Sequence, residues 1–561
     1  MDDILVRSIG RSVWHGWGDP SEAHPLGPAG WAALEREIGV TRINPVRPVA
    51  LADVRLPDQR LGHETLGALV AEVGAQHVHT DRWWRVHHAG GKGYPDLLRL
   101  RAGDGSAAPD AVVVPGDPSE VQALLRVCTE HRVAVIPYGG GTSVVGGVGR
   151  PDADLARFTG VVAVDLRRLD KAGAIDSVSL TATLGPGLRG PDVEQVLRPH
   201  GLTLGHVPQS HQEATLGGYV ATRSAGQAST GYGRIDDNVL GVRVATPRGE
   251  LVLGGRGPAS AAGPRLLDVV VGSEGALGII TEVTMQVAPA PTTKRYGAWL
   301  FASFAEGCEA LRYLAQRVGR GNAPEVCRLS DPVESRVNLA MAGRAGSAIL
   351  RYGRRRHLRE PTLLVLIWEG RDSRVLAARH RACTGALRAH GGRRVPRRVA
   401  QAWERGRFTG PYLRDELMDH SILVDTIETA TSWRNLTDLH DTVAGVLRSA
   451  LETDGVRALV MCHVSHIYAT GASLYFTVIA PQAAEPMDQW RRFKGAANDA
   501  VLAGGGTITH HHGVGRDHRA ALAEEIGDVG VRLLRAVKKE LDPTGVLNPA
   551  TLVPDLPDPS A

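Results

Sequence analysis

Short apolar runs alternate with helical periodicity in the first half of this chain. Residues 111–115, AVVVP, are apolar and β-branched, which predicts a buried strand. Residues 119–132 repeat apolar positions at helical spacing behind a candidate N-cap, Ser119, and predict a helix. A second buried strand is predicted at residues 133–137, so the three elements form a β-α-β unit that leads into the glycine-rich run 138–148.

The same kinds of pattern continue along the chain. Further strand-forming segments are predicted at residues 161–166, 177–187, 239–249 and 272–287. Proline-rich sequence at residues 289–291 then indicates a boundary. Beyond it the patterns predict strands at 363–370 and 473–480, a helix at 433–451, and a closing helix and turn at 531–549.

Composition and charge exclude several classes of protein. The 561 residues suffice for two or three domains, and the formal net charge of +4 implies no general attraction to nucleic acid, so we expect no such partner. The five cysteines contain no CxxC pair, which predicts no disulfide framework and fits a reducing cytoplasm. We expect no signal peptide in the first residues, no membrane-spanning helix, and no peroxisomal ending in PDPSA.

A basic stretch stands out at residues 343–361. It contains Arg351, Arg354, Arg355, Arg356 and Arg359. We interpret it as a solvated surface loop, with a lipid or phosphate patch, or a guard at a substrate entrance, as the alternatives.

The glycine-rich run PYGGGTSVVGG (137–147) directly follows a predicted buried strand. Consecutive glycines permit positive φ and leave backbone N–H groups free to converge on an anion. The spacing is neither a Rossmann fingerprint nor a Walker A loop. Phosphate binding and a structural turn both remain open from the residues alone.

Histidines form the most unusual string, THHHGVG (509–515). In a strand, His510 and His512 would share one face and His511 would point to the other. The run is compatible with a polar surface cluster, with metal ligation, or with acid/base and anion-stabilising chemistry. A second cluster at 462–476 adds His463, His466, Tyr468 and Tyr475, where a buried core tyrosine is the plain alternative.

Four segments taken together resemble the flavin-binding domain of the vanillyl-alcohol-oxidase family. They are residues 137–147, 181–187, 214–241 and 272–281, and the closing LDPTGVLNP at 541–549 also matches. The resemblance implies FAD as the cofactor. No histidine stands in the glycine-rich loop, as it does in covalently flavinylated relatives, so we expect the FAD to be bound non-covalently.

The resemblance assigns flavin contacts to specific positions, with Thr215 near the diphosphate and His206 near the ring. The full set comprises Pro137, Tyr138, Gly139, Gly140, Gly141, Thr142, Ser143, Val144, Gly147, His206, Gln209, Ser210, Thr215, Gly217, Gly218, Thr222, Ser224, Gly226, Gly272, Glu274, Gly275, Gly278, Ile279 and Ile280.

The family relationship also implies an α+β fold and its division. We expect a PCMH-type FAD-binding domain of two subdomains at residues 109–290 and an α+β cap, or substrate, domain at 291–530. An N-terminal helical and aromatic segment, 1–108, would pack on the core, and a C-terminal helix and turn, 531–561, would return to the FAD domain.

One branch of the family, which oxidises 2-hydroxy acids, carries a metal site at the two histidine clusters. Here Tyr475 stands roughly where its second histidine would fall and His511 stands where its glutamate would be, so we expect no metal. The remaining motifs resemble the alkyldihydroxyacetonephosphate synthase family, especially members of actinobacterial type. They are WHGWGDP (14–20), CRLSD (327–331), YLRD (412–415), DTIETATSW (425–433), ASLYF (472–476) and HHHGVG (510–515).

Roles follow from this resemblance residue by residue. Tyr475 matches the family's active-site tyrosine, and His510, His511 and His512 match the triplet beside the flavin. Arg328 and Arg414 match arginines that hold the substrate phosphate. The alternative for either residue is a surface ion pair, because arginine is abundant in this chain.

The implied activity is exchange of the acyl group of an acyl-dihydroxyacetone phosphate for a fatty alcohol, giving an ether lipid without net redox change. The alternatives are an FAD-dependent oxidoreductase acting on a 2-hydroxy acid or other alcohol, and a non-catalytic flavin-binding protein. The resemblance further implies a cytoplasmic homodimer in peripheral contact with a membrane.

Overall fold

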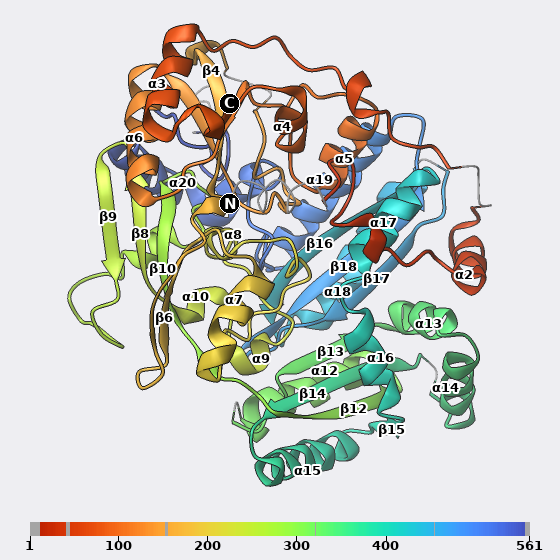
Figure 1. Cartoon of the computed structure of the whole chain (residues 1–561). Helices are drawn as coiled ribbons and strands as arrows, with labels where there is room; N and C mark the ends of the chain where they lie inside the picture. The colour runs from red at the N-terminus through yellow and green to blue at the C-terminus, as the bar shows by residue number, and fades with distance from the viewer. Residues whose placement is uncertain are drawn as a thin grey trace.

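The computed structural model describes residues 12–40, 45–151, 155–319, 321–358, 360–453 and 455–555 (Figure 1). The expectations about a leader and about the last five residues lie outside these ranges. Among the described residues no helix is long and apolar enough to cross a membrane. All five cysteines are buried and unpaired.

The β-α-β unit contributes β2 and the edge strand β3 to a four-stranded sheet in the order β1-β2-β4-β3, with β4 between them. The sheet comprises β1 (Val78–His79), β2 (Ala111–Val113), β4 (Gly160–Asp165) and β3 (Val133–Tyr138), and both β2 and β3 run parallel to β4. The crossover helix α6 (Pro118–Glu130) is capped by Asp117, which accepts from the N–H groups of Ser119 and Glu120. The predicted N-cap, Ser119, is therefore wrong, because Pro118 occupies the first helical turn and Asp117 supplies the cap.

A five-stranded antiparallel sheet follows in the order β5-β6-β10-β8-β9. Its strands are β5 (Ala172–Asp176), β6 (Thr181–Leu184), β10 (Ile279–Gln286), β8 (Val239–Thr246) and β9 (Gly249–Gly254). The core between this sheet and α7 (Gly190–Leu197), α8 (Leu216–Ala221) and α10 (Ile235–Asn238) is aliphatic. Thr215 caps α8 by accepting from the N–H of Gly218, which fixes where that helix begins.

The largest sheet has seven antiparallel strands in the order β15-β12-β14-β13-β17-β18-β16 (Figure 1). They are β15 (Arg393–Val395), β12 (Thr293–Phe301), β14 (Thr362–Gly370), β13 (Val326–Ser330), β17 (Leu459–Val464), β18 (Gly471–Pro481) and β16 (Ile422–Ser432). One face packs on α12 (Phe304–Tyr313), α15 (Ser373–Ala389), α18 (Leu436–Glu452) and α19 (Pro486–Ala503). This is the main core, in which Trp299, Phe476 and Phe493 are fully buried.

The opposite face carries α13 (Pro332–Met341), α14 (Gly343–Arg355), α16 (Arg398–Gly406) and α17 (Gly410–Asp419). The basic stretch, interpreted as a loop, is therefore largely the helix α14. Its Ile349, Leu350 and Tyr352 pack on the sheet while its arginines point to solvent, a division that the arginine-rich sequence obscured.

The N-terminal segment packs against both halves of the molecule. Helix α2 (Pro28–Ile38) packs on the seven-stranded sheet through Trp31, Leu34 and Ile38. Helix α3 (His63–Val73) covers α6, and α4 (Arg82–His87) and α5 (Tyr94–Arg101) come next along the chain. Trp17 donates its backbone N–H to Asp415 at 2.5 Å. This hydrogen bond joins the segment WHGWGDP (14–20) to the segment YLRD (412–415).

The C-terminal helix α20 (Arg519–Leu541) begins earlier than residue 531, so the expected domain boundary at 530 falls inside it. A kink at Gly527 divides it. After α20 the chain runs beside β3, where Val135 and Asn548 donate N–H groups to Val546 and Val135 respectively, both at 2.8 Å. The tail is thereby joined to the four-stranded sheet.

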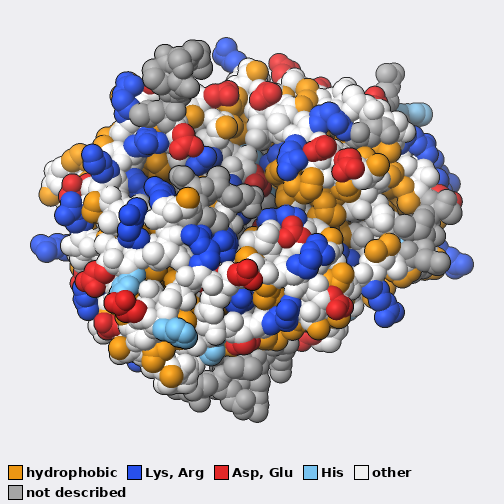
Figure 2. All heavy atoms as spheres, turned by 90° about the horizontal axis from the view of Figure 1, so that it is seen from above, with side chains coloured by type: hydrophobic (Ala, Val, Ile, Leu, Met, Phe, Trp, Pro, Cys, Tyr) orange, Lys and Arg blue, Asp and Glu red, His pale blue; other side chains and the backbone are white. Residues whose placement is uncertain are grey.

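Figure 2 shows acidic and basic side chains interspersed with hydrophobic ones over the top of the molecule as drawn in Figure 1. This mixed surface agrees with the small net charge.

Replacing Gly515 by Ala should destabilise the protein. Gly515 has φ +56°, and a Cβ there would lie 1.9 Å from the carbonyl oxygen of Val145. The strained loop should lower the free energy of unfolding by about 2 kcal/mol or more. Urea denaturation followed by tryptophan fluorescence measures this.

The matched control is Gly445→Ala in α18, where a Cβ meets nothing within 4 Å. This variant should be unchanged or up to about 1 kcal/mol more stable, because Ala is the better helix former. Equal unfolding midpoints for Gly515→Ala and the wild type would contradict the prediction.

Candidate active site

A cavity of about 430 Å³ lies where the glycine-rich loop, the start of α8 and one face of the seven-stranded sheet meet. Most residues that the sequence singled out line this cavity. From the flavin-binding set they are Pro137, Tyr138, Gly139, Gly140, Gly141, Thr142, Ser143, Val144, Gly147, Gln209, Ser210, Thr215, Gly217, Gly218, Thr222, Ser224, Glu274, Gly275, Gly278, Ile279 and Ile280; from the catalytic and substrate sets they are Arg328, Arg414, Tyr475, His511 and His512.

Four predicted residues lie behind the cavity wall instead: His206, Gly226, Gly272 and His510. His206 is buried, with its Nε2 3.1 Å from the hydroxyl of Ser224, which does line the cavity. Burial lowers the pKa of His206 to about 3, so its ring is neutral. It supports the lining without reaching the cavity.

The glycine-rich loop has glycines because other backbone lies against it. A Cβ on Gly140 would lie 2.1 Å from the carbonyl oxygen of Glu213, and one on Gly139 would lie 2.3 Å from Oγ1 of Thr215. The hydroxyl of Ser143 accepts the N–H of Gly147 at 2.9 Å, which curls the loop on itself. The loop therefore packs on the segment before α8 and lines the cavity with backbone and hydroxyl groups.

This lining fits FAD. Backbone N–H groups and hydroxyls from two glycine-rich segments suit the diphosphate, and the start of α8 adds the donors of a helix N-terminus. The sheet face beyond them offers the aromatic and imidazole side chains of Tyr475, His463 and His511. Thr142, Ser143 and Thr215 are the hydroxyls of the lining that would hold the phosphates.

Lys92 is a buried cation in this wall that sequence reasoning missed. Its Nζ donates to the carbonyl of Val13 at 2.8 Å, and burial lowers its pKa to about 8. It follows the loop containing Gly90 and Gly91, and its own N–H donates to the carbonyl of Ser143 at 2.7 Å. The sequence did not indicate a role for Lys92, because only the folded chain brings this residue next to the glycine-rich loop 137–147.

Arg328 extends from β13 and is held by two partners. Its guanidinium donates to Glu334 at 2.8 Å and lies 3.0 Å from Nε2 of His463, and Glu334 in turn lies 3.0 Å from Nδ1 of His463. Burial opposes ionisation of Glu334, but Arg328 and then His463 outweigh it and hold the pKa of Glu334 at about 2. The Nε of Arg328 is buried without a protein partner among the described residues, which leaves one donor for a ligand.

Arg414 extends from α17 and is also anchored. It donates to Asp415 at 3.0 Å and to the carbonyl of Lys92 at 2.5 Å. Asp415 accepts the N–H of Trp17 with its other oxygen. The N-terminal segment thus sets the position of an arginine that belongs to the cap.

Glu428 organises the histidine run. This carboxylate, buried on β16, accepts the backbone N–H groups of His510, His511 and His512 at 2.7, 3.0 and 2.9 Å and the hydroxyl of Thr509 at 2.6 Å. The run is consequently a loop around a carboxylate. The expectation that His510 and His512 share a strand face is wrong, because His511 and His512 line the cavity and His510 lies behind.

Burial opposes ionisation of Glu428, but His511 and then the neighbouring histidines outweigh it and hold its pKa well below the ordinary range. Burial lowers the pKa of His510 strongly and that of His512 to about 3, so both rings are neutral. The site therefore combines a buried anion with imidazoles that are held in the neutral form.

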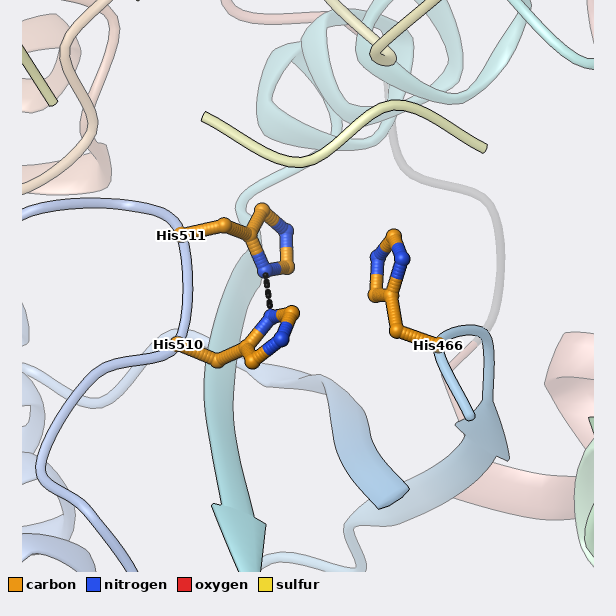
Figure 3. Close-up of side chains that lie close together, drawn as sticks. All are labelled: His466, His510 and His511. Atoms are coloured by element: carbon orange, nitrogen blue, oxygen red, sulfur yellow. Dashed lines mark hydrogen bonds between the residues drawn. The ribbon is translucent and has the colours of Figure 1, made fainter. Parts of the chain in front are cut away.

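Three imidazoles meet at the cavity wall, as Figure 3 shows for His466, His510 and His511; His466 and His511 line the cavity and His510 lies behind them. One ring nitrogen from each lies within 4.8 Å of the others, a spacing that a metal ion could share. The rings are already engaged: Nδ1 of His466 lies 2.5 Å from the hydroxyl of Ser229, and Nδ1 of His510 lies 3.0 Å from Nδ1 of His511. The absence of a metal stays a prediction.

Tyr475 projects from β18 into the cavity. Its ring is stacked on His463 with centroids 4.9 Å apart and lies near His511 and His512. Burial raises its pKa to about 12, so the hydroxyl stays protonated and able to donate.

Comparisons with known proteins agree with this geometry. Residues 109–254 match the family model described as FAD binding domain, and residues 290–552 match the one described as FAD linked oxidases, C-terminal domain. The chain is 30% identical to alkyldihydroxyacetonephosphate synthase of Dictyostelium discoideum over 97% of this chain and 93% of the relative. It is 31% identical to the Trypanosoma brucei brucei protein of that name over 90% and 82%.

Solved structures extend the comparison. A structure of alkyldihydroxyacetonephosphate synthase superimposes with a TM-score of 0.83 at 28% identity, covering 96% of this chain and 99% of that one. p-Cresol methylhydroxylase superimposes with a TM-score of 0.64 at 16% identity, covering 88% and 97%, and shows the fold alone.

Fold, site and comparisons together define an FAD-dependent enzyme with an FAD-binding domain and an FAD-linked-oxidase C-terminal domain. Within that class the chain belongs to the alkyldihydroxyacetonephosphate synthase family.

Acid should destabilise the protein through Glu428. A carboxylate whose folded pKa lies below its ordinary value of 4.5 stabilises the fold above that pH, and the contribution is lost as pH falls. The free energy of unfolding should therefore decrease between about pH 5 and pH 3. Glu428→Gln should lower stability at pH 7 by about 3 kcal/mol and flatten this acid limb.

Chemical denaturation at a series of pH values makes the comparison. Glu309→Gln is the control, because Glu309 forms an exposed ion pair with Arg312 and should change little at any pH. An unchanged acid limb in Glu428→Gln would contradict the assignment.

Proposed function

We propose that this enzyme exchanges the acyl group of an acyl-dihydroxyacetone phosphate for a fatty alcohol, forming an ether lipid. The observation that carries the proposal is a single cavity lined by two anchored arginines, Arg328 and Arg414, together with Tyr475 and the histidines 511 and 512. Membership of the alkyldihydroxyacetonephosphate synthase family supports the same reaction.

The two arginines suit a phosphate dianion. Each guanidinium is oriented by a carboxylate, Glu334 for Arg328 and Asp415 for Arg414, so neither needs to be ordered when the substrate arrives. Their planar forks offer several donors to phosphate oxygens.

The remaining groups suit proton transfer beside a ketone. The C1 hydrogen of the substrate has to be removed, which needs a base within hydrogen-bond reach. His511 is in the cavity wall, and Tyr475 offers a protonated hydroxyl that can donate to an oxygen. Bound FAD supplies an electron sink for this chemistry.

A second candidate is an FAD-dependent oxidoreductase acting on a 2-hydroxy acid or other alcohol. It is favoured by the cluster of His466, His510 and His511 and by 26% identity to the mitochondrial D-lactate dehydrogenase of Arabidopsis thaliana over 80% of this chain. The synthase relatives match at higher identity and over more of the chain, so we place this function second.

We further propose non-covalent FAD, a four-part division with boundaries at residues 108 and 290 and at the start of α20, and a cytoplasmic homodimer in peripheral contact with a membrane. Five buried free cysteines suit a reducing compartment. The exposed apolar side chains Ile526, Val529 and Leu533, all on α20, suit a contact between two copies.

The basic surface of α14 and α16 suits anionic lipid. Both helices turn apolar side chains inward, including Ile349 and Trp403, and expose arginines. The exposed arginines are Arg344, Arg351, Arg354, Arg355, Arg356, Arg397, Arg398 and Arg405, and none has a carboxylate partner within the described ranges.

Activity is tested with purified holoenzyme, palmitoyl-dihydroxyacetone phosphate and hexadecanol. We expect ether lipid and an equal amount of free palmitate. Arg328→Lys and Arg414→Lys should raise KM about tenfold or more, because each loses a planar fork on the phosphate. Flavin reduction by a hydroxy acid, with no ether formed, would overturn the proposal in favour of the oxidoreductase.

Arg312→Lys is the matched control, since Arg312 lies on the surface in an ion pair with Glu309. It should leave KM and kcat unchanged.

Membrane contact is tested by cosedimentation with vesicles containing phosphatidylserine. Replacing Arg351, Arg354 and Arg355 together by Gln should weaken binding roughly 100-fold, at about 1 kcal/mol per charge. Arg243→Gln, on the five-stranded sheet, is the control. Equal binding of the triple variant, or binding to neutral vesicles alone, would contradict a contact through α14.

A further inference from the structure

The exchange reaction takes a proton from C1 of the substrate and later returns one, a step that rests on the proposed function. The hydrogen at C1 of the substrate is removed as a proton and is later replaced, whereas the proton of the alcohol leaves with the fatty acid. A base inside the cavity can hold the C1 proton until it returns, or pass it to solvent and later recover another.

A hydrogen-bonded chain leads away from the cavity through three side chains. His511 lines the cavity, and its Nδ1 lies 3.0 Å from Nδ1 of His510. Nε2 of His510 lies 2.6 Å from the hydroxyl of Tyr468. Tyr468 lies between β17 and β18 and is half-buried, so the chain begins at the cavity and ends near solvent.

Glu428 sets the direction of this chain. Its carboxylate lies 3.3 Å from Nδ1 of His511, which favours a hydrogen on that nitrogen and leaves the lone pair on Nε2. That one Nδ1 hydrogen is shared between Glu428 at 3.3 Å and Nδ1 of His510 at 3.0 Å, and with its lone pair on Nδ1 the ring of His510 carries its hydrogen on Nε2, towards Tyr468. His511 is thereby a base on its cavity side and a donor on its inner side.

Arg234 lies at the outer end of this hydrogen-bonded chain, beside Tyr468. It donates to the carbonyl of His510 at 2.8 Å and is paired with Asp236 at 2.9 Å. Burial raises the pKa of Tyr468 to about 12, against the opposing effect of the Arg234 charge, so the hydroxyl stays protonated and releases its proton only as it receives one from His510.

We propose that His511, His510 and Tyr468 form a proton relay between the substrate's C1 and solvent. Nε2 of His511 takes the C1 proton, and the Nδ1 proton of His511 moves to Nδ1 of His510. The Nε2 proton of His510 then moves to the hydroxyl oxygen of Tyr468, and the original hydroxyl proton of Tyr468 moves to water. Every group is neutral before and after, and one proton has crossed the wall. Return of a proton to C1 along the same chain restores the starting tautomers.

Tyr468→Phe in the holoenzyme tests the relay. In D₂O, wild-type enzyme should exchange the C1 hydrogen of palmitoyl-dihydroxyacetone phosphate, measured by proton NMR. Removing the hydroxyl should slow that exchange about tenfold or more, lower kcat and leave KM unchanged. The ether formed should retain more of the original C1 hydrogen, because the proton returns from His511 instead of leaving.

Tyr232→Phe is the matched control. Its hydroxyl donates to Glu369 at 3.0 Å and takes no part in the chain, so loss of one tyrosine hydrogen bond should leave exchange at the wild-type rate. A relay also predicts that imidazole added to the His510→Ala variant restores exchange, which a purely structural defect would not show.

The outcomes separate the relay from the proposed function. Ether formation and C1 exchange at wild-type rates in Tyr468→Phe would overturn the relay and leave the synthase activity standing. A bound metal whose removal by chelator abolishes exchange would also overturn it, since the metal would occupy the lone pairs that the relay needs. Wild-type enzyme that forms no ether and exchanges no hydrogen would overturn both.

Discussion

One buried carboxylate determines the geometry of the catalytic side of this enzyme. Glu428 accepts three consecutive backbone N–H groups and a hydroxyl, so residues 509–512 curl around it. Glu428 pairs with Tyr475 in the register of β16 and β18, which brings the tyrosine and the histidines to one wall. A carboxylate so deeply buried is tolerated only because all these donors satisfy it, and the same donors make the loop rigid.

Anchoring by carboxylates recurs at the two arginines for which we propose contact with the substrate phosphate. Arg328 and Arg414 come from β13 and α17, and each is held by an acidic side chain close to it in sequence, Glu334 or Asp415. Buried ion pairs add little to stability by themselves, and their larger effect here is to orient two guanidinium groups before any ligand binds. Asp415 is in turn held by Trp17, so the N-terminal segment positions Arg414 as well as placing its own Lys92 in the cavity wall.

The cavity lies between parts of the chain that are distant in sequence. The glycine-rich loop packs on residues just before α8, the tail pairs beside β3, and Asn548 donates to the carbonyls of Gly147 and Glu274. The cofactor-binding loops are thereby fixed by both ends of the chain. That arrangement explains why the resemblance to a flavoprotein family extended over segments from residue 137 to residue 549 and not over one local motif.

The sequence by itself determined the β-α-β unit, several further strands, the glycine-rich loops and most of the residues singled out in the cavity lining, because glycine-rich turns and apolar periodicity act locally. It could not reveal Lys92, Glu334, Glu428 or the place of Tyr468, since an isolated charged or aromatic residue has no local signature. It also treated α14 as a loop and described only how the histidine run would lie in a strand, whereas the run is a loop; His206 and His510, expected beside the flavin, do not line the cavity. Only the tertiary structure decided these points, because hydrogen bonds between residues far apart in sequence, such as Glu428 with His512 or Arg414 with Lys92, and not backbone propensity, set where each side chain points.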